Sequence, residues 1–114
     1  MTSDRMRRVD EAVRQVVGDA VAQDLKDPRV GFVTVTDVKT TTDLRHARVY
    51  VSVLGDRKVR QASLDGLRSA HGFLQRRVAA DLRMKNTPEL EFILDDTTEK
   101  AFRLERLIRR ETQG

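Results

Sequence analysis

The chain has no cysteine and no tryptophan, and it has only two histidines among its 114 residues, His46 and His71. Without cysteine it forms no disulfide and offers no thiolate to a metal. Two imidazoles fall short of a typical zinc site, so we expect no metal and no other cofactor. Aromatic residues make up only 4% of the chain, which argues against a sheet that binds RNA by stacking bases on several rings.

Long apolar runs are also absent, and none approaches the roughly 20 residues that a membrane-spanning helix needs. The first residues carry charges at Asp4, Arg5, Arg7 and Arg8 and lack the apolar stretch of a signal peptide. We therefore expect a cytoplasmic protein that does not bind membranes. The length suits one domain with a self-supporting core, so residues 1–114 are taken as a single domain whose ordered part is about 5–110.

Motifs for nucleotide binding and catalysis are missing from the sequence. It contains neither a G-x-x-x-x-G-K-[ST] loop nor a G-x-G-x-x-G fingerprint. The acidic pair Asp95 and Asp96 lies in a turn before a predicted helix, where carboxylates commonly stabilise the helix start. His71 has no recognisable nucleophile beside it. We therefore predict no catalytic residue, and rank an RNA-cleaving enzyme last among the alternatives.

Positive charge is what the chain has in excess, and this charge is unevenly distributed. Overall, 22 basic residues stand against 18 acidic ones, for a formal net charge of +4. Residues 57–85 carry eight bases and two acids, whereas residues 86–99 carry five acids and no base. Clustered cations are typical of a surface that binds a polyanion such as RNA, although a merely solvated surface has the same composition.

Hydrophobic periodicity predicts four helices. Apolar residues recur at spacings of three and four, as on one face of a helix. The expected helices span residues 4–26, 57–69, 72–84 and about 99–110, the last with Phe102, Leu104, Leu107 and Ile108 as its apolar residues. Asp27-Pro28 ends the first helix, because proline disfavours the helical conformation of the residue before it.

Three strands are predicted from β-branched and alternating stretches. They span residues 30–38, 46–54 and 90–94. The first two are joined by a turn at 40–43 and should form an antiparallel hairpin. The order α-β-β-α-kink-α-β-α predicts an α+β domain, in which a small three-stranded sheet has helices packed on one face and solvent on the other.

The joint between the second and third helices is the most informative feature. KH RNA-binding domains place a G-x-x-G loop between two helices, where the backbone clamps nucleotides. This chain has Ser69-Ala70-His71-Gly72 at that point and therefore no G-x-x-G. Gly72 has two interpretations: it lets an RNA backbone approach closely, or it only lets the two helices pack closely.

Basic and polar residues surround this joint and favour contact with RNA. Arginine binds phosphate through two parallel hydrogen bonds and also stacks on bases. The candidate RNA-binding residues are Arg68, Ser69, Ala70, His71, Gly72, Gln75, Arg76, Arg77, Arg83, Lys85 and, from the strand at 46–54, Arg48.

Three stretches of the chain resemble the bacterial ribosome-binding factor A family. The first and most specific runs from Lys26-Asp27-Pro28-Arg29-Val30-Gly31-Phe32 through residue 55. The second is residues 67–74 with the Ala70-His71-Gly72 kink, which is similar to the family's alanine-x-glycine joint. The third is residues 87–92 followed by Asp95-Asp96-Thr97. Together they cover roughly residues 5–110.

This resemblance implies a type II KH-like fold and a ribosome assembly factor without catalytic activity. Family members bind the small (30S) ribosomal subunit and its 16S rRNA, assist late maturation and processing of the precursor 5′ end, and support growth in the cold. The rRNA contact would lie at the Ala70-His71-Gly72 joint. We expect a monomer, because no apolar seam indicates an obligate dimer, and we leave open whether an assembly GTPase is a partner. The alternatives are a generic KH-type single-stranded RNA-binding protein and a protein-only adaptor that uses the open sheet face.

Overall fold

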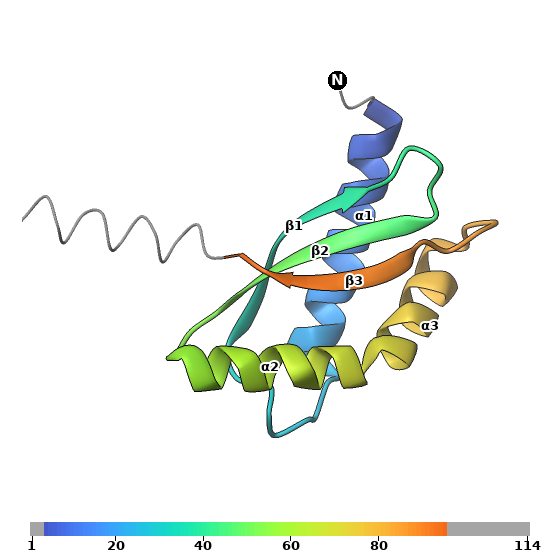
Figure 1. Cartoon of the computed structure of the whole chain (residues 1–114). Helices are drawn as coiled ribbons and strands as arrows, with labels where there is room; N and C mark the ends of the chain where they lie inside the picture. The colour runs from blue at the N-terminus through green and yellow to red at the C-terminus, as the bar shows by residue number, and fades with distance from the viewer. Residues whose placement is uncertain (1–3, 96–114) are drawn as a thin grey trace, which may run out of the picture.

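A computed structural model of the chain describes residues 4–95. It contains α1 (Asp4–Gln23), β1 (Val33–Thr40), β2 (His46–Val53), α2 (Arg57–Ser69), α3 (His71–Leu82) and β3 (Glu89–Leu94). The helices form one layer against one face of the three-stranded sheet (Figure 1), as the sequence predicted. The helix expected at about 99–110 lies outside the described residues.

The sheet has β2 at its centre, with β1 and β3 on either side. The predicted hairpin is confirmed, because β1 pairs antiparallel with β2 and sets Val35 opposite Val51. One extra residue in β1, at Thr36, interrupts this register. β3 pairs with β2 in parallel, which requires a long crossover, and α2 and α3 supply it.

Alternation along β2 decides which face of the sheet is buried. Ala47, Val49, Val51 and Val53 are buried, whereas the residues between them face outward. The buried side chains pack against the apolar stripes of the helices. The core includes Val13 and Val17 of α1, Leu67 of α2, Leu74 and Val78 of α3, and Phe92 of β3.

Some predicted boundaries are wrong by two or three residues, each for a local reason. β1 begins at Val33 and not at residue 30, because hydrogen bonds hold the preceding loop elsewhere. The Val30 N–H donates to Asp27 O (3.0 Å), and the Gly31 N–H donates to Ser63 Oγ (3.1 Å). The helix expected at 4–26 ends at Gln23. α3 ends at Leu82 because Arg83 adopts the left-handed conformation, with φ 48° and ψ 38°.

The loop between α1 and β1 packs tightly on α2 at Gly66. A Cβ added there would lie 2.6 Å from Val30 Cγ2 and 3.5 Å from Arg29 Cβ. Glycine is therefore needed inside this helix so that the loop can approach its backbone. The side chain of Ser63, one turn earlier, accepts from Gly31 N and donates to Arg29 O (3.3 Å). These contacts hold the side of α2 that carries Ser63 and Gly66 against the loop, just before the joint that follows.

Candidate nucleic-acid interface

A single residue forms the joint between α2 and α3. Ala70 has φ −87° and ψ 8°, between the helical and turn regions, and it caps both helices. Its N–H donates to Gly66 O and Leu67 O (3.1 Å each), and its carbonyl accepts from Leu74 N (3.0 Å). Because its methyl group cannot accept a hydrogen bond, the first N–H groups of α3 have no side-chain cap. The kink predicted from the sequence is therefore present, and it is tighter than a loop.

The surroundings of Gly72 distinguish its two interpretations. Among the described residues, a Cβ added to Gly72 would meet only one atom within 4 Å, which is Nη1 of Arg76 at 3.3 Å. No atom of α1 or α2 comes near, so close helix packing does not explain this glycine. The bare backbone of Gly72 instead leaves room for the Arg76 guanidinium, which lies over the start of α3.

Several predicted residues are brought together at this exposed joint. Arg68, Ser69, Gly72 and Arg76 are exposed, and His71 is half-buried. Neither Arg68 nor Arg76 forms an ion pair with any residue between 4 and 95. Within that range the joint therefore presents two guanidinium groups without a carboxylate partner, beside uncapped backbone N–H groups. Such a combination attracts phosphate.

Gln75, another of the predicted residues, links α3 to the start of β3. Its Nε2 donates to Pro88 O (2.6 Å), and its Oε1 accepts from Leu90 N (3.1 Å). Both ends of the amide are thus used to hold the start of β3 against α3. Gln75 is half-buried, and these two bonds position the scaffold beside the joint.

Arg77 is likewise engaged, although it directly follows Arg76. Its Nη1 lies 2.5 Å from Asp24 Oδ2, just past the end of α1, and its Nε lies 3.2 Å from Asp81 Oδ2. The hydrogen bond to Asp24 is the largest of the effects that raise the pKa of Arg77. Two carboxylates therefore neutralise this guanidinium and tie α3 to α1.

The remaining predicted residues lie away from the joint. Arg83 and Lys85 are exposed in the segment after α3, where the left-handed backbone of Arg83 ends the helix. Arg48 lies on the open face of the sheet, opposite Lys39 of β1 and Glu91 of β3. Because the helices cover the other face, Arg48 is not part of the same surface as Arg76.

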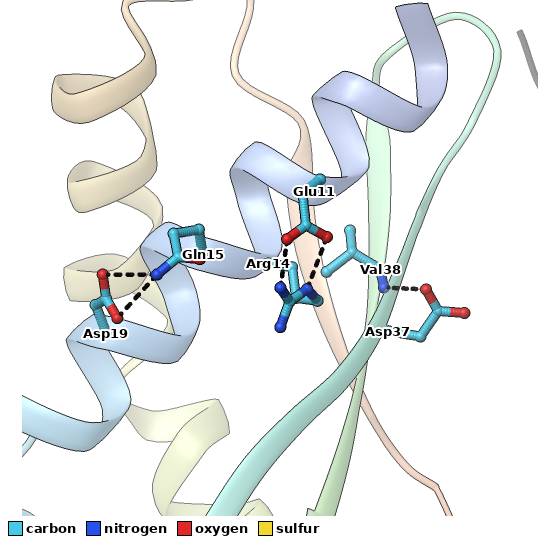
Figure 2. A network of polar contacts seen from close by, with 6 residues as sticks. All are labelled: Glu11, Arg14, Gln15, Asp19, Asp37 and Val38. Carbon is cyan, nitrogen blue, oxygen red and sulfur yellow. Dashed lines mark hydrogen bonds and ion pairs between the residues drawn. The ribbon is translucent and has the colours of Figure 1, made fainter. Parts of the chain in front are cut away.

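Figure 2 shows by contrast a charged helix face that is balanced. On α1, both oxygens of Glu11 accept from Arg14, with Nε to Oε2 at 2.8 Å, and Gln15 Nε2 lies 3.3 Å from both oxygens of Asp19. The hydrogen bond from Arg14 lowers the pKa of Glu11, and its counterpart raises the pKa of Arg14. Two turns earlier Arg7 pairs with Asp4 at 2.5 Å. These arginines are paired, unlike those of the joint.

Two exposed cations of the basic run lie outside the predicted set, Arg57 and Lys58 at the start of α2. Neither forms an ion pair in the described part of the chain, and Asp56 caps the helix beside them by accepting from Val59 N (2.9 Å). They belong to the basic run 57–85, but they lie at the opposite end of α2 from the joint.

Neither a metal site nor a membrane span is found in the residues that the structure describes. No group of three or more His, Asp or Glu side chains between residues 4 and 95 is placed to hold a metal ion. None of the helices in that range is both long and apolar enough to cross a membrane.

Comparison with known proteins identifies the family. The family model of ribosome-binding factor A matches residues 5–108. The chain belongs to this family. Among curated ribosome-binding factor A proteins, the one from Anaeromyxobacter sp. (strain K) is 48% identical over 115 residues, covering 99% of this chain and 83% of the relative. The one from Halothermothrix orenii is 38% identical over 110 residues, covering 96% of this chain and 90% of the relative.

Solved structures of ribosome-binding factor A share the fold. The crystal structure of the Thermus thermophilus protein superposes with a TM-score of 0.70 at 26% identity, covering 78% of this chain and 93% of that one. A second match is a homology model of the T. thermophilus protein fitted into the cryo-EM map of a 30S–RbfA complex. It has a TM-score of 0.64 at 27% identity and covers 75% of this chain and 90% of the other.

Proposed function

We propose that this protein is a ribosome assembly factor that binds the small ribosomal subunit through its 16S rRNA. The observation that carries the proposal is the match of the ribosome-binding factor A family model to residues 5–108, which includes the joint. The T. thermophilus relative, placed in the map of a 30S–RbfA complex, supports the choice of partner. The role extends to late subunit maturation and to processing of the 16S precursor at its 5′ end.

The interface that fits this role is the joint between α2 and α3. Arg68 and Arg76 lack ion-pair partners in residues 4–95, and the α3 N-terminus adds backbone N–H groups that favour phosphate. Ser69, Ala70, His71 and Gly72 provide the small or polar surface between them. Arg83 and Lys85 extend the cationic surface, whereas Gln75 and Arg77 hold it in place.

Binding through phosphates recognises the shape of folded rRNA more than its base sequence. Cations that contact phosphate release counterions, so affinity should fall steeply as salt rises. If the bound surface fits an immature rRNA conformation better than the mature one, binding holds the immature state until the subunit rearranges. This is how a protein without catalysis would assist maturation.

Co-sedimentation with purified small subunits, at low and high salt and with large subunits as control, tests the proposal. We expect selective binding to small subunits that weakens as salt rises. Equal binding to both subunits would leave only a generic basic RNA-binding domain. Binding that is insensitive to salt would favour a protein-only adaptor using the open sheet face.

The role in processing needs a separate experiment in cells. Depletion of the protein should make 16S precursor with an unprocessed 5′ end accumulate, most strongly in the cold, and the intact gene should restore processing. A depleted strain with normal precursor levels would limit the role to binding. We further propose that the protein acts in the cytoplasm as a monomer, with an assembly GTPase as a candidate further partner. Light scattering checks the monomer, and co-sedimentation with and without the GTPase checks the partner.

A further inference from the structure

An apolar pair is exposed at one end of the open sheet face. Phe32 is 81% exposed and Leu54 is 75% exposed. The Leu54 N–H donates to Phe32 O (3.1 Å), which continues the β1–β2 ladder by one residue pair. Residues directly opposite each other in an antiparallel pair point to the same face and lie within contact distance. The two side chains therefore form one patch.

The patch is at the place where the described chain leaves the sheet. β3 runs parallel to β2 and pairs Leu94 with Val51, and the Asp95 N–H donates to Val51 O (2.7 Å). Leu54 is three residues beyond Val51, or about 10 Å along the strand. The left-hand end of the sheet in Figure 1 shows the ends of β2 and β3 side by side.

The side chain of Asp95, the last residue that the structure describes, lies on the open face of the sheet. Thr36 Oγ1, in the bulge of β1, lies 2.8 Å from Asp95 Oδ2 and 3.2 Å from Tyr50 O. Asp95 therefore reaches over β2 on the open face, where Phe32 and Leu54 also lie.

The rest of the sequence contains a segment that matches the patch. Leu104, Leu107 and Ile108 recur at spacings of three and four and would share one face of a helix. The eight residues 96–103 can span up to about 26 Å when extended, well over the distance required. We propose that residues 104–108 dock on Phe32 and Leu54 and cover this end of the open face.

The size and position of the patch favour residues 104–108 over a second copy of the chain as the group that covers it. A stable interface between proteins buries about 800 Å² on each partner, far more than one exposed pair offers. A tethered segment needs less area, because the linker keeps its local concentration high. The proposal does not depend on ribosome binding, so it can fail while the proposed function stands.

Fluorescence of a single tryptophan tests the docking. The chain has no tryptophan, so Phe32→Trp gives one reporter in the patch. The emission wavelength of this tryptophan and its quenching by acrylamide are compared between the full chain and a chain that ends at Thr98. A Leu104→Gln/Leu107→Gln variant disrupts the proposed contact, and Arg106→Gln/Arg109→Gln, on the other side of the predicted helix, is the matched control.

We expect the full chain and the arginine control to emit at shorter wavelength and to resist quenching by acrylamide. The stopped chain and the leucine variant should both lose this protection, with unchanged circular dichroism of the domain. Leu54→Trp, on the neighbouring strand, is a second reporter if Phe32→Trp disturbs folding. Equal quenching in all four proteins would overturn the proposal. So would protection that vanishes on dilution, which indicates a second copy, or that appears only when small subunits are added.

Discussion

Arg76 and Arg77 are consecutive arginines of α3, and the structure predicts opposite consequences for their substitution. About 100° separates neighbouring residues around a helix, so the two side chains leave in different directions. Arg76 lies over Gly72 at the exposed joint without an ion pair in residues 4–95, whereas Arg77 binds Asp24 and Asp81. Arg76→Gln should weaken subunit binding, and Arg77→Gln should weaken the fold.

The expected magnitudes follow from these surroundings. Removing one cation that touches a phosphate lowers the slope of log affinity against log salt by about 0.7–0.9, so Arg76→Gln should reduce the slope by somewhat less than one. Arg77 and both its carboxylates are more than one-third exposed, so water and salt screen these pairs. Removing both pairs should lower Tm by a few degrees, about 2–8 °C.

Two measurements on both variants separate these effects. Co-sedimentation with small subunits over a range of salt concentrations gives the slope, and calorimetry of the free protein gives Tm. Arg76→Gln should leave Tm near that of the unmodified chain, and Arg77→Gln should leave the salt slope unchanged. If Arg77→Gln flattens the slope as much as Arg76→Gln, then the assignment of Arg77 to the scaffold is wrong. If neither variant changes it, the joint is not the interface.

Three further substitutions test the scaffold around the joint. Gly66→Ala should lower the free energy of unfolding, measured in urea, by about 1 kcal/mol, because overpacking against Val30 costs about 1–3 kcal/mol and the gain in helix propensity is only about 1 kcal/mol. In a Val30→Ala background the overpacking is relieved, so the same substitution should stabilise the protein. Gln75→Leu should cost about 1–3 kcal/mol in the same assay and speed exchange of the Leu90 amide, which loses its acceptor. The hydrogen bonds from Arg29 lower the pKa of Asp27 to about 2, below its ordinary value. Ionised Asp27 should therefore stabilise the fold at pH values above its ordinary pKa, and this stabilisation should be lost as pH falls through about 2. Asp27→Asn should remove this part of the pH dependence of the free energy of unfolding.

The sequence predicted best what depends on neighbouring residues. The alternation in 46–54 placed the four buried residues of β2 correctly, because a strand repeats every two residues. The short turn between the first two strands predicted their antiparallel pairing, since a short turn permits no other arrangement. The helix expected at 57–69 has the bounds observed, with Gly55-Asp56 before it and the joint after it.

Contacts between distant parts of the chain could not be predicted from the sequence alone. The parallel pairing of β3 with β2 follows from how α2 and α3 cross the sheet, and no local signal encodes it. Arg77 finds its partner 53 residues away, and Gln75 bonds to a strand that follows a loop. Both residues look like surface polar groups in the sequence. The prediction placed both among the RNA-binding residues because they lie near the joint, and it could not foresee these contacts.

One signal in the sequence was available and was not used. In the strand at 46–54 the outward positions run His46, Arg48, Tyr50, Ser52 and then Leu54, so the last of them breaks the polar pattern. An apolar residue on the solvent side of a sheet indicates either a partner or a covering segment. The structure pairs Leu54 with exposed Phe32 and brings the end of β3 alongside. The open face thus has a region of mixed charge around Arg48 and an apolar end, and the apolar end is the part that a further segment of the chain would cover.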